Sequence, residues 1–278
     1  PVMIRACCIG WPIHHVRSPL IHGFWLKAYG IDGEYTREAV EPGEAHAFLR
    51  SLADRGFTGC NVTIPHKEVA FAAMDEVDPG AVAVGAVNTV WHEGGRLIGM
   101  NSDVTGFLLN LDDQVPGWDR EVGHAVVLGA GGAARGIVHG LRSRGIETIT
   151  LANRSLSKAE AIAAGDPRRI RPVAWSDLPL ALPGADLIVN TTSLGMSGQP
   201  PLDLALDGLK SAAIVSDIVY VPLVTQLLAE ARRRGHRTAE GLGMLLHQAV
   251  PGFRKWFGVT PEVTPALHAH LAADIRGH

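Results

Sequence analysis

The sequence of 278 residues predicts an α/β protein of two domains. Strand and helix patterns alternate along the first hundred or so residues, which is typical of a largely parallel sheet covered by helices. After a loop at residues 112–123 the alternation begins again at Ala125 and indicates a second sheet. The chain is long enough for two domains with separate cores. We therefore place the first domain at residues 1–104 plus 241–278 and the second at residues 105–240.

The first domain begins with an apolar strand, and glycine or proline residues end most of its segments. Leu20, Phe24 and Ala28 recur at helical spacing before Gly30 and predict a helix. Two consecutive glycines indicate a hairpin between the last two strands. In chain order we expect strands at residues 4–9, 34–40, 57–62, 86–91 and 96–100, and helices at residues 19–29, 42–55 and 67–74.

The second domain shows six short apolar segments separated by helical patterns, which again favours an α/β layer. We expect its strands near residues 125–128, 147–152, 170–174, 186–190, 213–218 and 236–238. A helix at residues 104–111 connects the two domains. Helices at residues 242–256 and 265–275 follow the last strand and are expected to return to the first domain, closing a cleft between the two.

A glycine-rich turn follows the first strand of the second domain. Residues 125–135 read Ala-Val-Val-Leu-Gly-Ala-Gly-Gly-Ala-Ala-Arg, a buried strand that runs through a tight turn into a helix. Gly129 and Gly131 let the backbone bend and approach a pyrophosphate, whose charge then faces the free N–H groups of the helix start. The pattern predicts a Rossmann domain whose contacts with a dinucleotide are Gly129, Ala130, Gly131, Gly132 and Ala133.

The end of the next strand indicates which dinucleotide is bound. In chains that bind NAD, a carboxylate follows the glycine turn by about 20 residues and grips the ribose 2′-hydroxyl. Here the strand is followed by Asn153, Arg154 and Ser155, with Lys158 one helical turn further on. Arg154 and Lys158 attract a 2′-phosphate that a carboxylate would repel. The sequence therefore predicts NADP(H) as the cofactor.

The composition excludes several classes of partner. The formal net charge is −3, so we expect no broad basic surface for nucleic acid or an anionic membrane. No apolar run approaches the ~20 residues of a membrane span, and the N-terminus lacks a secretory pattern. Cys7, Cys8 and Cys60 are too few for a disulfide framework and fit buried thiols in a reducing cytoplasm. We expect a cytoplasmic protein, monomer or homodimer, that acts on a small molecule.

The histidines deserve one test as metal ligands, because the chain contains 13 of them. His14, His15 and His22 form the one cluster near each other in sequence. No carboxylate stands at ligand spacing beside them, and histidines are common in loops and at helix starts. We therefore expect no metal site.

Polar residues gather at strand ends of the first domain. Asn61, Thr63 and Lys67 span the end of a strand and the start of a helix. This places Thr63 and Lys67 at the carboxyl edge of a sheet, where α/β proteins usually bind their ligands. Asn88 and the segment Asn-Ser-Asp at residues 101–103 also lie at strand ends, although such residues are ordinary in turns.

Ser18 stands at the start of a helix, after a loop that begins at Gly10. The following Pro19 fits the first turn of that helix, so a plain N-cap is one explanation for the serine. A site for a ligand at this position is the other explanation, and the two stay open from the residues alone.

Together these motifs resemble those of the shikimate dehydrogenases, over essentially the whole chain. In order they are Gly10-x-Pro12-Ile13-x-His15-x-x-Ser18-Pro19, Asn61-Val62-Thr63-x-Pro65-x-Lys67, Gly85-Ala86-Val87-Asn88-Thr89, Asn101-Ser102-Asp103-x-x-Gly106, Gly129-Ala130-Gly131-Gly132-Ala133, Asn153-Arg154-Ser155-x-x-Lys158 and Gly241-Leu242-Gly243-Met244-Leu245-x-x-Gln248. Jointly these motifs are highly specific.

The resemblance implies an active site in the cleft between a substrate-binding domain and an NADP-binding Rossmann domain. Lys67 and Asp103 match the catalytic pair of the family, and Ser18 matches one of two serines that hold the substrate carboxylate. Substrate-binding positions are further matched by Thr63, Asn88, Asp103, Tyr220 and Gln248. Cofactor positions are matched by Gly129, Ala130, Gly131, Gly132, Ala133, Asn153, Arg154, Ser155 and Lys158, with Ile218 and Gly241 near the nicotinamide.

The matched residue types suit the reduction of a ring ketone. Such a reaction needs a hydride donor on one face and a proton donor at the oxygen, which a protonated Lys67 supplies. We interpret Lys67 and Asp103 as a positioning and proton-relay unit and leave the catalytic base unassigned. The resemblance implies an NADP-dependent shikimate dehydrogenase, which reversibly reduces 3-dehydroshikimate to shikimate in aromatic amino acid (chorismate) biosynthesis.

One position departs from the family. Val16 stands where the family usually has a serine, two residues before Ser18, and a valine cannot donate a hydrogen bond to a carboxylate. Losing a hydrogen bond to a charged group costs about 1.5–3 kcal/mol. The charge of Arg17 could compensate. Two alternatives therefore stay open: a quinate or aminoshikimate-type dehydrogenase of the same family, and a non-catalytic NADPH-binding sensor on the same fold.

Overall fold

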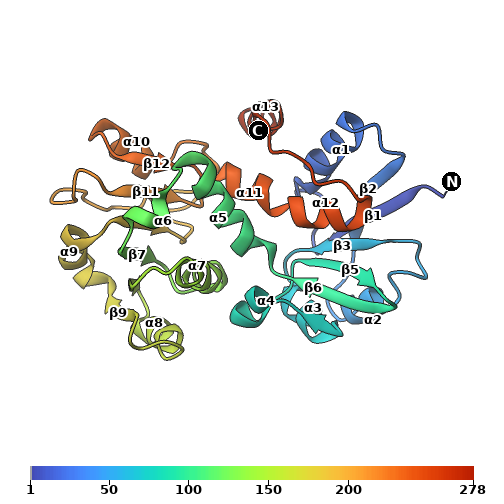
Figure 1. Ribbon diagram of the computed structural model, residues 1–278, viewed down its shortest axis with the longest axis horizontal. Coiled ribbons are helices and arrows are strands. Elements are labelled where there is room, and N and C mark those ends of the chain that lie inside the picture. The colour runs from blue at the N-terminus through green and yellow to red at the C-terminus, as the bar shows by residue number, and fades with distance from the viewer. Residues whose placement is uncertain (1) are drawn as a thin grey trace. The chain divides into compact units, whose positions relative to one another are not determined.

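The computed structural model describes residues 2–278 and divides into two compact α/β units. Unit 1 comprises the chain up to Gly106 together with Leu246–Leu271, and unit 2 comprises Phe107–Leu245 and Ala272–His278. Each described unit contains a six-stranded sheet (Figure 1). The predicted fold class, two α/β layers in sequence, is confirmed. None of the helices in residues 2–278 has the length and apolar character that a bilayer crossing demands.

The sheet of unit 1 is mixed, with the strand order β2-β1-β3-β5-β6-β4. Strand β1 pairs in parallel with β2 and β3, whereas β5 is antiparallel to β3 and to β6. The predicted hairpin is confirmed, and Gly94 and Gly95 form its turn with φ values of 58° and 75°. The strands are β1 (Ile4–Gly10), β2 (Gly33–Ala39), β3 (Gly59–Val62), β4 (Glu76–Val77), β5 (Thr89–Glu93) and β6 (Arg96–Met100).

Alternation of side chains along the strands gives the sheet of unit 1 two covered faces. Cys7, Ile9 and Cys60 lie in one core cluster with residues of the helices α2 (Ala45–Arg50) and α3 (Lys67–Ala73). The other face contacts α1 (Ser18–Ala28) at β2 and α12 (Val250–Phe257) at β1, β3 and β5. All three cysteines are buried free thiols, as the sequence predicts.

The short elements of unit 1 differ from the expectations. The helix expected at residues 42–55 ends at Arg50 and is followed by turns. The strand expected from residue 86 begins at Thr89, because residues 86–88 form a loop. The sequence patterns missed both β4 and α4 (Pro79–Val84), which are too short to show a period.

The helix expected at residues 242–256 is two helices, α11 (Leu242–Gln248) and α12, with Ala249 between them. Pro251 accounts for the break, since proline has no N–H and its ring clashes with the carbonyl four residues earlier. Proline is tolerated in the first turn of a helix, which is where it stands in α12. Helix α13 (Pro265–Arg276) agrees with the predicted helix at residues 265–275.

The sheet of unit 2 is entirely parallel, with the order β12-β11-β10-β7-β8-β9. Counted from its own first strand this is the order 3-2-1-4-5-6 of a doubly wound nucleotide-binding sheet. All six predicted strands are present. They are β7 (His124–Leu128), β8 (Thr148–Asn153), β9 (Ile170–Ala174), β10 (Leu187–Asn190), β11 (Ile214–Asp217) and β12 (Arg237–Ala239).

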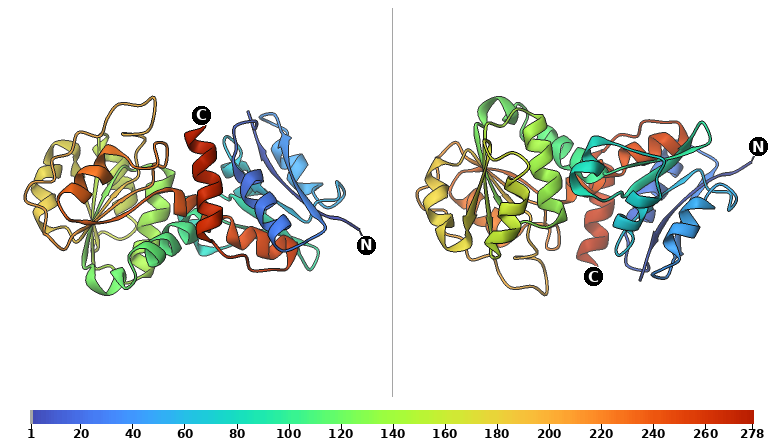
Figure 2. Two further views of the ribbon diagram at one scale, coloured as in Figure 1. Left: turned by 90° about the horizontal axis from the view of Figure 1, so that it is seen from above. Right: turned by 90° about the horizontal axis from the view of Figure 1, so that it is seen from below.

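Helices cover both faces of this parallel sheet, as Figure 2 shows in two views. Alternate strand residues face α7 (Gly132–Ser143) and α8 (Leu156–Ala163) in one core cluster. The remaining strand residues face α9 (Leu178–Ala181) and α10 (Gln226–Arg233) in another. The connecting helix is longer than expected: α5 runs over Ser102–Gln114, and the expected loop after it contains the short helix α6 (Trp118–Glu121).

An aromatic cluster fills the space between α1, α12 and the sheet of unit 1. The ring of His22 stacks on Tyr35 with centroids 4.2 Å apart, and Trp25, Phe253 and Trp256 lie within 6 Å of it. Both ring nitrogens of His22 are buried, and neither has a hydrogen-bond partner within residues 2–278. Burial lowers the pKa of His22 to about 3, so the imidazole is neutral near pH 7.

Gly59 provides a test of this packing. A Cβ at Gly59 would collide with the indole of Trp256 and the carbonyl of Val90, which are themselves hydrogen-bonded at 2.9 Å. We expect Gly59→Ala to lower the free energy of unfolding by about 1–3 kcal/mol, as overpacking does. The control is Gly23→Ala in the exposed middle of α1, where a Cβ would meet nothing within 4 Å. It is expected to stabilise by about 0.5–1 kcal/mol. Urea unfolding of both variants measures this, and equal effects would contradict the packing described.

The buried His22 predicts that the free energy of unfolding depends on pH. Its pKa is lower in the folded chain than in the unfolded chain, so the unfolded chain binds more protons between pH ~3 and ~6.5. The stability that neutral His22 contributes is complete above the unfolded pKa and is lost as the pH falls toward 3. Between about pH 7 and pH 4.5 we expect wild-type stability to fall by about 2–3 kcal/mol more than that of His22→Phe. Parallel stability curves from urea unfolding would contradict this.

Candidate functional site

The charged pair Lys67 and Asp103 lies within unit 1. Lys67 is the first residue of α3, and Asp103 lies in the first turn of α5. The Lys67 Nζ is 3.4 Å from Asp103 Oδ2, and the two side chains are 33% and 34% exposed. Two backbone contacts fix their positions: Val87 N–H donates to the Lys67 carbonyl at 2.9 Å, and Asp103 N–H donates to Asn101 Oδ1 at 3.2 Å. An ammonium and a carboxylate thus meet where a substrate can reach them, as proton transfer requires.

Asn88 is oriented by a buried hydrogen-bond network. Its Oδ1 lies 2.8 Å from the Ser102 N–H that donates to it, 3.1 Å from the Ser102 hydroxyl and 3.0 Å from the Thr89 hydroxyl. The Ser102 hydroxyl also lies 3.4 Å from Oε1 of Gln248, at the end of α11. Since donors surround the Asn88 oxygen, its Nδ2 is the group that remains to donate to a ligand. The structure therefore brings Asn88 and Gln248 together, although their positions in the sequence are far apart.

Thr63 and Ser18 follow the ends of β3 and β1. Thr63 N–H donates to the Ile9 carbonyl at 2.9 Å, and a Cβ at Gly10 would lie 2.5 Å from the Thr63 methyl group. Ser18 is buried and is the first residue of α1, but the N-cap is Arg17 and no side chain caps the helix. The explanation of Ser18 as a plain N-cap is therefore wrong, because its hydroxyl does not perform that role.

The loop before Ser18 is held by an arginine that the sequence did not indicate. Arg37 on β2 donates from Nε and Nη2 to the Val16 carbonyl, at 3.2 and 2.8 Å. The Val16 N–H donates to the Ile13 carbonyl at 3.2 Å. Val16 is half-buried, and the hydrogen bonds that hold it are made by its backbone N–H and carbonyl groups.

In the glycine-rich turn of unit 2, glycine is required for two different reasons. Gly129 has φ +106°, and a Cβ there would lie 2.6 Å from Thr191 Oγ1. Gly131 has an ordinary φ of −87° and is the N-cap of α7, so the interpretation that both glycines bend the chain is right only for Gly129. A Cβ at Gly131 or Gly132 would meet no protein atom within 4 Å. These two glycines instead leave open space in front of the first N–H groups of α7, which suits a pyrophosphate.

The basic residues after β8 are exposed and carry net positive charge. Asn153 Nδ2 donates to the Ser155 carbonyl at 2.9 Å and fixes the turn. Arg154, Ser155 and Lys158 are exposed, and across residues 2–278 no carboxylate forms an ion pair with Arg154 or Lys158. The observed donor set fits the 2′-phosphate of NADP, since two unneutralised cations stand beside a helix start.

Ile218 and Gly241, both expected near the nicotinamide, contact each other. A Cβ at Gly241 would lie 2.5 Å from the Ile218 carbonyl oxygen, so only glycine permits this approach. The Ile218 N–H donates to the Asn190 carbonyl at 3.1 Å. Tyr220 follows in the same loop and belongs to unit 2, whereas Lys67 and the other substrate positions belong to unit 1.

Asp217 is a site-supporting residue that the sequence analysis missed. Its Oδ1 accepts from Asn190 Nδ2 at 3.1 Å and from Val219 N–H at 3.0 Å, and its Oδ2 accepts from the Thr225 hydroxyl at 2.8 Å. Burial raises its pKa to about 6 in spite of these donors. Asp217 thus joins the last residue of β10 to the loop after β11, which carries Ile218 and Tyr220. The signal available in the sequence was an acidic residue, Asp217, at the end of an apolar strand.

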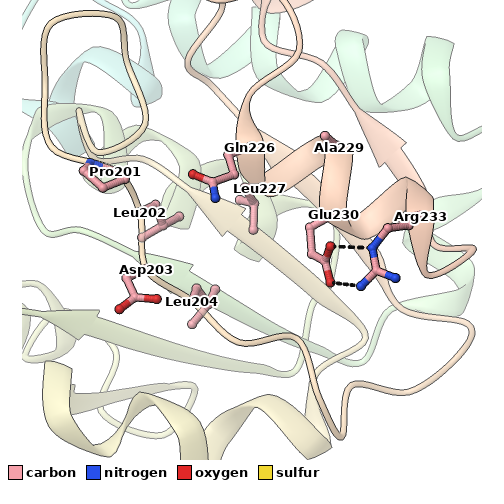
Figure 3. Close-up of a pocket in the computed structure, with 9 residues that line it drawn as sticks. All are labelled: Pro201, Leu202, Asp203, Leu204, Gln226, Leu227, Ala229, Glu230 and Arg233. Atoms are coloured by element: carbon pink, nitrogen blue, oxygen red, sulfur yellow. Dashed lines mark hydrogen bonds and ion pairs between the residues drawn. The ribbon is translucent and has the colours of Figure 1, made fainter.

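A pocket of about 500 Å³ lies elsewhere in unit 2, between the segment 201–204 and α10 (Figure 3). Glu230 and Arg233 line it and form a two-pronged ion pair at 2.8 and 2.7 Å. None of the predicted site residues lines this pocket. The pocket is therefore separate from the candidate site.

The histidine cluster does not assemble as a site. His22 is buried in the aromatic cluster of unit 1, whereas His14 and His15 are exposed with ring centroids 5.5 Å apart. Within the part of the chain that the structure describes, no three histidine, cysteine, aspartate or glutamate side chains come together in a way that could hold a metal ion.

Comparison with protein families gives three matches in order along the chain. Residues 8–90 match the shikimate dehydrogenase substrate binding domain. Residues 116–196 match the family described as shikimate / quinate 5-dehydrogenase. Residues 241–269 match the shikimate 5′-dehydrogenase C-terminal domain. The three matches together span well over half of the chain.

Individual relatives agree with these matches. The chain is 54% identical over 273 residues to the shikimate dehydrogenase (NADP(+)) of Azorhizobium caulinodans, covering 98% of this chain and 97% of the relative. The shikimate 5-dehydrogenase of Thermus thermophilus, solved with NADP(H) and shikimate, superposes with a TM-score of 0.84 at 34% identity, covering 98% and 100%. The quinate dehydrogenase of Corynebacterium glutamicum, solved with NAD, gives 0.88 at 29% identity, covering 98% and 99%.

Proposed function

The chain belongs to the shikimate dehydrogenase family, and on that premise we propose that it catalyses the NADP-dependent, reversible reduction of 3-dehydroshikimate to shikimate. The observation that carries the proposal is the pair Lys67 and Asp103, 3.4 Å apart beside the oriented amide of Asn88. A protein that only binds NADPH does not need this pair. The relatives that are more than half identical carry the name of the NADP-dependent enzyme.

In the proposed reaction, bound NADPH supplies a hydride to the ring carbonyl carbon. Lys67 donates a proton to the carbonyl oxygen, which completes the hydroxyl group, and it stabilises negative charge that develops there. Asp103 holds the ammonium group in place and accepts its N–H in the resting pair. In the oxidative direction the hydroxyl proton returns to this pair, and its accepting atom stays unassigned.

We assign the substrate contacts by donor geometry. Asn88, through Nδ2, and Gln248 bind ring hydroxyl groups in unit 1, together with Thr63. Ser18 holds the carboxylate through its hydroxyl group, which does not cap the helix. Tyr220, in unit 2, matches a further polyol-binding position of the family. Each of these roles is a proposal that substitution can test separately.

We assign the cofactor contacts in the same way. The pyrophosphate lies against Gly129 to Ala133 at the start of α7, and the 2′-phosphate lies against Asn153, Arg154, Ser155 and Lys158. Ile218 and Gly241 lie against the nicotinamide. The three reduced thiols also fit the cytoplasm, where we expect an enzyme of aromatic amino acid biosynthesis to work.

A quinate-type dehydrogenase is the second candidate. The observation that favours it is the likeness to quinate dehydrogenase, combined with Val16 at the carboxylate position. The experiment that decides is steady-state reduction of NADP⁺ and of NAD⁺ with shikimate and with quinate. We expect the highest kcat/KM for NADP⁺ with shikimate. A dominant quinate rate, or a preference for NAD⁺, would overturn the proposal.

The catalytic pair gives a direct prediction. We expect Lys67→Ala to lower turnover by roughly 10²–10⁴-fold while NADPH binding persists, because only proton transfer is removed. Lys27→Ala on α1 is the control, since Lys27 is an exposed lysine that the mechanism does not use. Stopped-flow turnover and NADPH fluorescence measure the two effects. Near-normal turnover of Lys67→Ala would refute its assignment.

The valine at position 16, where the family usually has a serine, gives a second prediction. Val16→Ser restores a donor for the carboxylate, so we expect KM for shikimate to fall by about tenfold or more, with kcat nearly unchanged. The matched control is Val69→Ser, at an exposed position on α3. An unchanged KM in Val16→Ser would show that the carboxylate does not reach residue 16.

A further inference from the structure

We propose that Arg37 is a specificity-determining residue for the substrate carboxylate: its guanidinium group supplies, beside residue 16, the attraction for an anion that the side chain of Val16 does not offer. This inference rests on the proposed function. Arg37 lies outside all the motifs of the family resemblance. The inference assigns to it the selection of carboxylic acids over neutral cyclic polyols.

The position of Arg37 follows from the register of two parallel strands. Arg37 lies on β2, opposite Cys8 of β1, and both residues are near the ends of their strands. Tyr35 lies two residues earlier and therefore on the same face of β2. Since the ring of Tyr35 stacks on His22 of α1, the side chain of Arg37 also lies on the α1 side of the sheet. This is the side on which the loop from β1 enters α1 at Ser18.

Two hydrogen bonds anchor the guanidinium group to this loop. Arg37 Nε and Nη2 donate to the Val16 carbonyl oxygen at 3.2 and 2.8 Å. A guanidinium group has five N–H donors, and this contact uses two of them. The other donors, on Nη1 and Nη2, form no hydrogen bond within residues 2–278. A cation with unused donors is thus fixed within hydrogen-bond distance of residue 16, whose side chain has no donor.

Arg37 is not neutralised, because across the described residues no carboxylate forms an ion pair with it. Glu34 and Glu38 alternate to the opposite face of β2. Glu34 forms an ion pair with Arg5 there. Glu38 accepts from the Thr36 hydroxyl at 2.8 Å. The charge of Arg37 is therefore available to an anionic ligand, since the residue is also exposed.

The start of α1 adds to the positive potential beside Arg37. Ser18 is the first residue of this helix, and the first turn contains no acidic residue and no side-chain cap. The N-terminus of a helix carries partial positive charge. The carboxylate that we assign to Ser18 therefore lies at a helix start, two residues after the carbonyl group that anchors Arg37. Because a charge acts beyond hydrogen-bond distance, Arg37 attracts this carboxylate without occupying the place of a serine hydroxyl.

The test separates the charge of Arg37 from its contact with the loop. Arg37→Gln removes the charge and keeps an amide donor, whereas Arg37→Lys keeps the charge and removes the planar fork. Kinetics are measured at saturating NADP⁺ with shikimate and with its analogue in which CH₂OH replaces the carboxylate.

We expect Arg37→Gln to raise KM for shikimate about 5- to 30-fold, which lies between the effects of an exposed ion pair and of a hydrogen bond to a charged group. We expect Arg37→Lys to raise it by less than about threefold, since the charge remains. In both variants kcat with shikimate, and kcat/KM for the neutral analogue, should stay within about twofold.

Ionic strength and a control variant give independent measurements. Salt screens exposed charges, so KM for shikimate should rise with added NaCl more steeply in wild type than in Arg37→Gln. Arg254→Gln is the matched control, because Arg254 is an exposed arginine of α12 in the same unit without an ion pair in the described chain. This variant loses the same charge and should keep KM for shikimate within about twofold. Melting temperatures of all variants establish that they are folded.

Four results would overturn the role of Arg37: an unchanged KM in Arg37→Gln, equal effects of Arg37→Gln and Arg37→Lys, an equal loss of kcat/KM for shikimate and the neutral analogue, or the same salt dependence in wild type and Arg37→Gln. Wild-type protein without turnover on shikimate would instead refute the proposed function and, with it, this inference.

Discussion

The antiparallel pairing of β5 with β3 is the constraint on which the site in unit 1 depends. Parallel strands β1 and β3 end at one edge of the sheet, and loops from this edge carry Ser18 and Thr63. Because β5 runs in the opposite direction, it starts at that edge, with Asn61 opposite Thr89. Strand β6 then returns to the edge, with Met100 opposite Thr89. Residues from four strand ends therefore meet without any long loop.

Buried hydrogen bonds hold the residues at these four strand ends in fixed positions. Asn88 and Ser102 are almost fully buried, so leaving their polar atoms unpaired would cost about 1–3 kcal/mol each. When the Asn88 oxygen is bonded within the protein, the direction of its amide donor, Nδ2, is fixed as well. Asp217 has the corresponding role in unit 2, where it accepts from the last residue of β10 and from the loop that follows β11. In both units the orienting residues are buried, and in unit 1 the Asn88 amide keeps a donor, Nδ2, for a ligand.

Periodicity and glycine positions were sufficient to predict the strands, most helices and the turn at Gly129, because these features are local. They failed for β4 and α4, whose few residues show no period, and for the break at Pro251 inside an apolar segment. The motifs also nominated Lys67, Asn88 and Gln248, but not the Ser102 contacts that bring two of them together. The pattern within one strand indicates which face a side chain lies on, but not which residue of a distant strand stands opposite it. Tyr35 is the clearest example, since it meets Asn61 only across β1.

Val16 and the pair Lys67 and Asp103 are held in place by different contacts. Val16 lies on the loop before Ser18, whose backbone Arg37 holds, whereas Lys67 and Asp103 are fixed by contacts from other strand ends. Under the proposed function, a change at residue 16 therefore acts on carboxylate binding and leaves the contacts of Lys67 and Asp103 intact. Preference between shikimate and quinate can thus change at this position without loss of the pair Lys67 and Asp103.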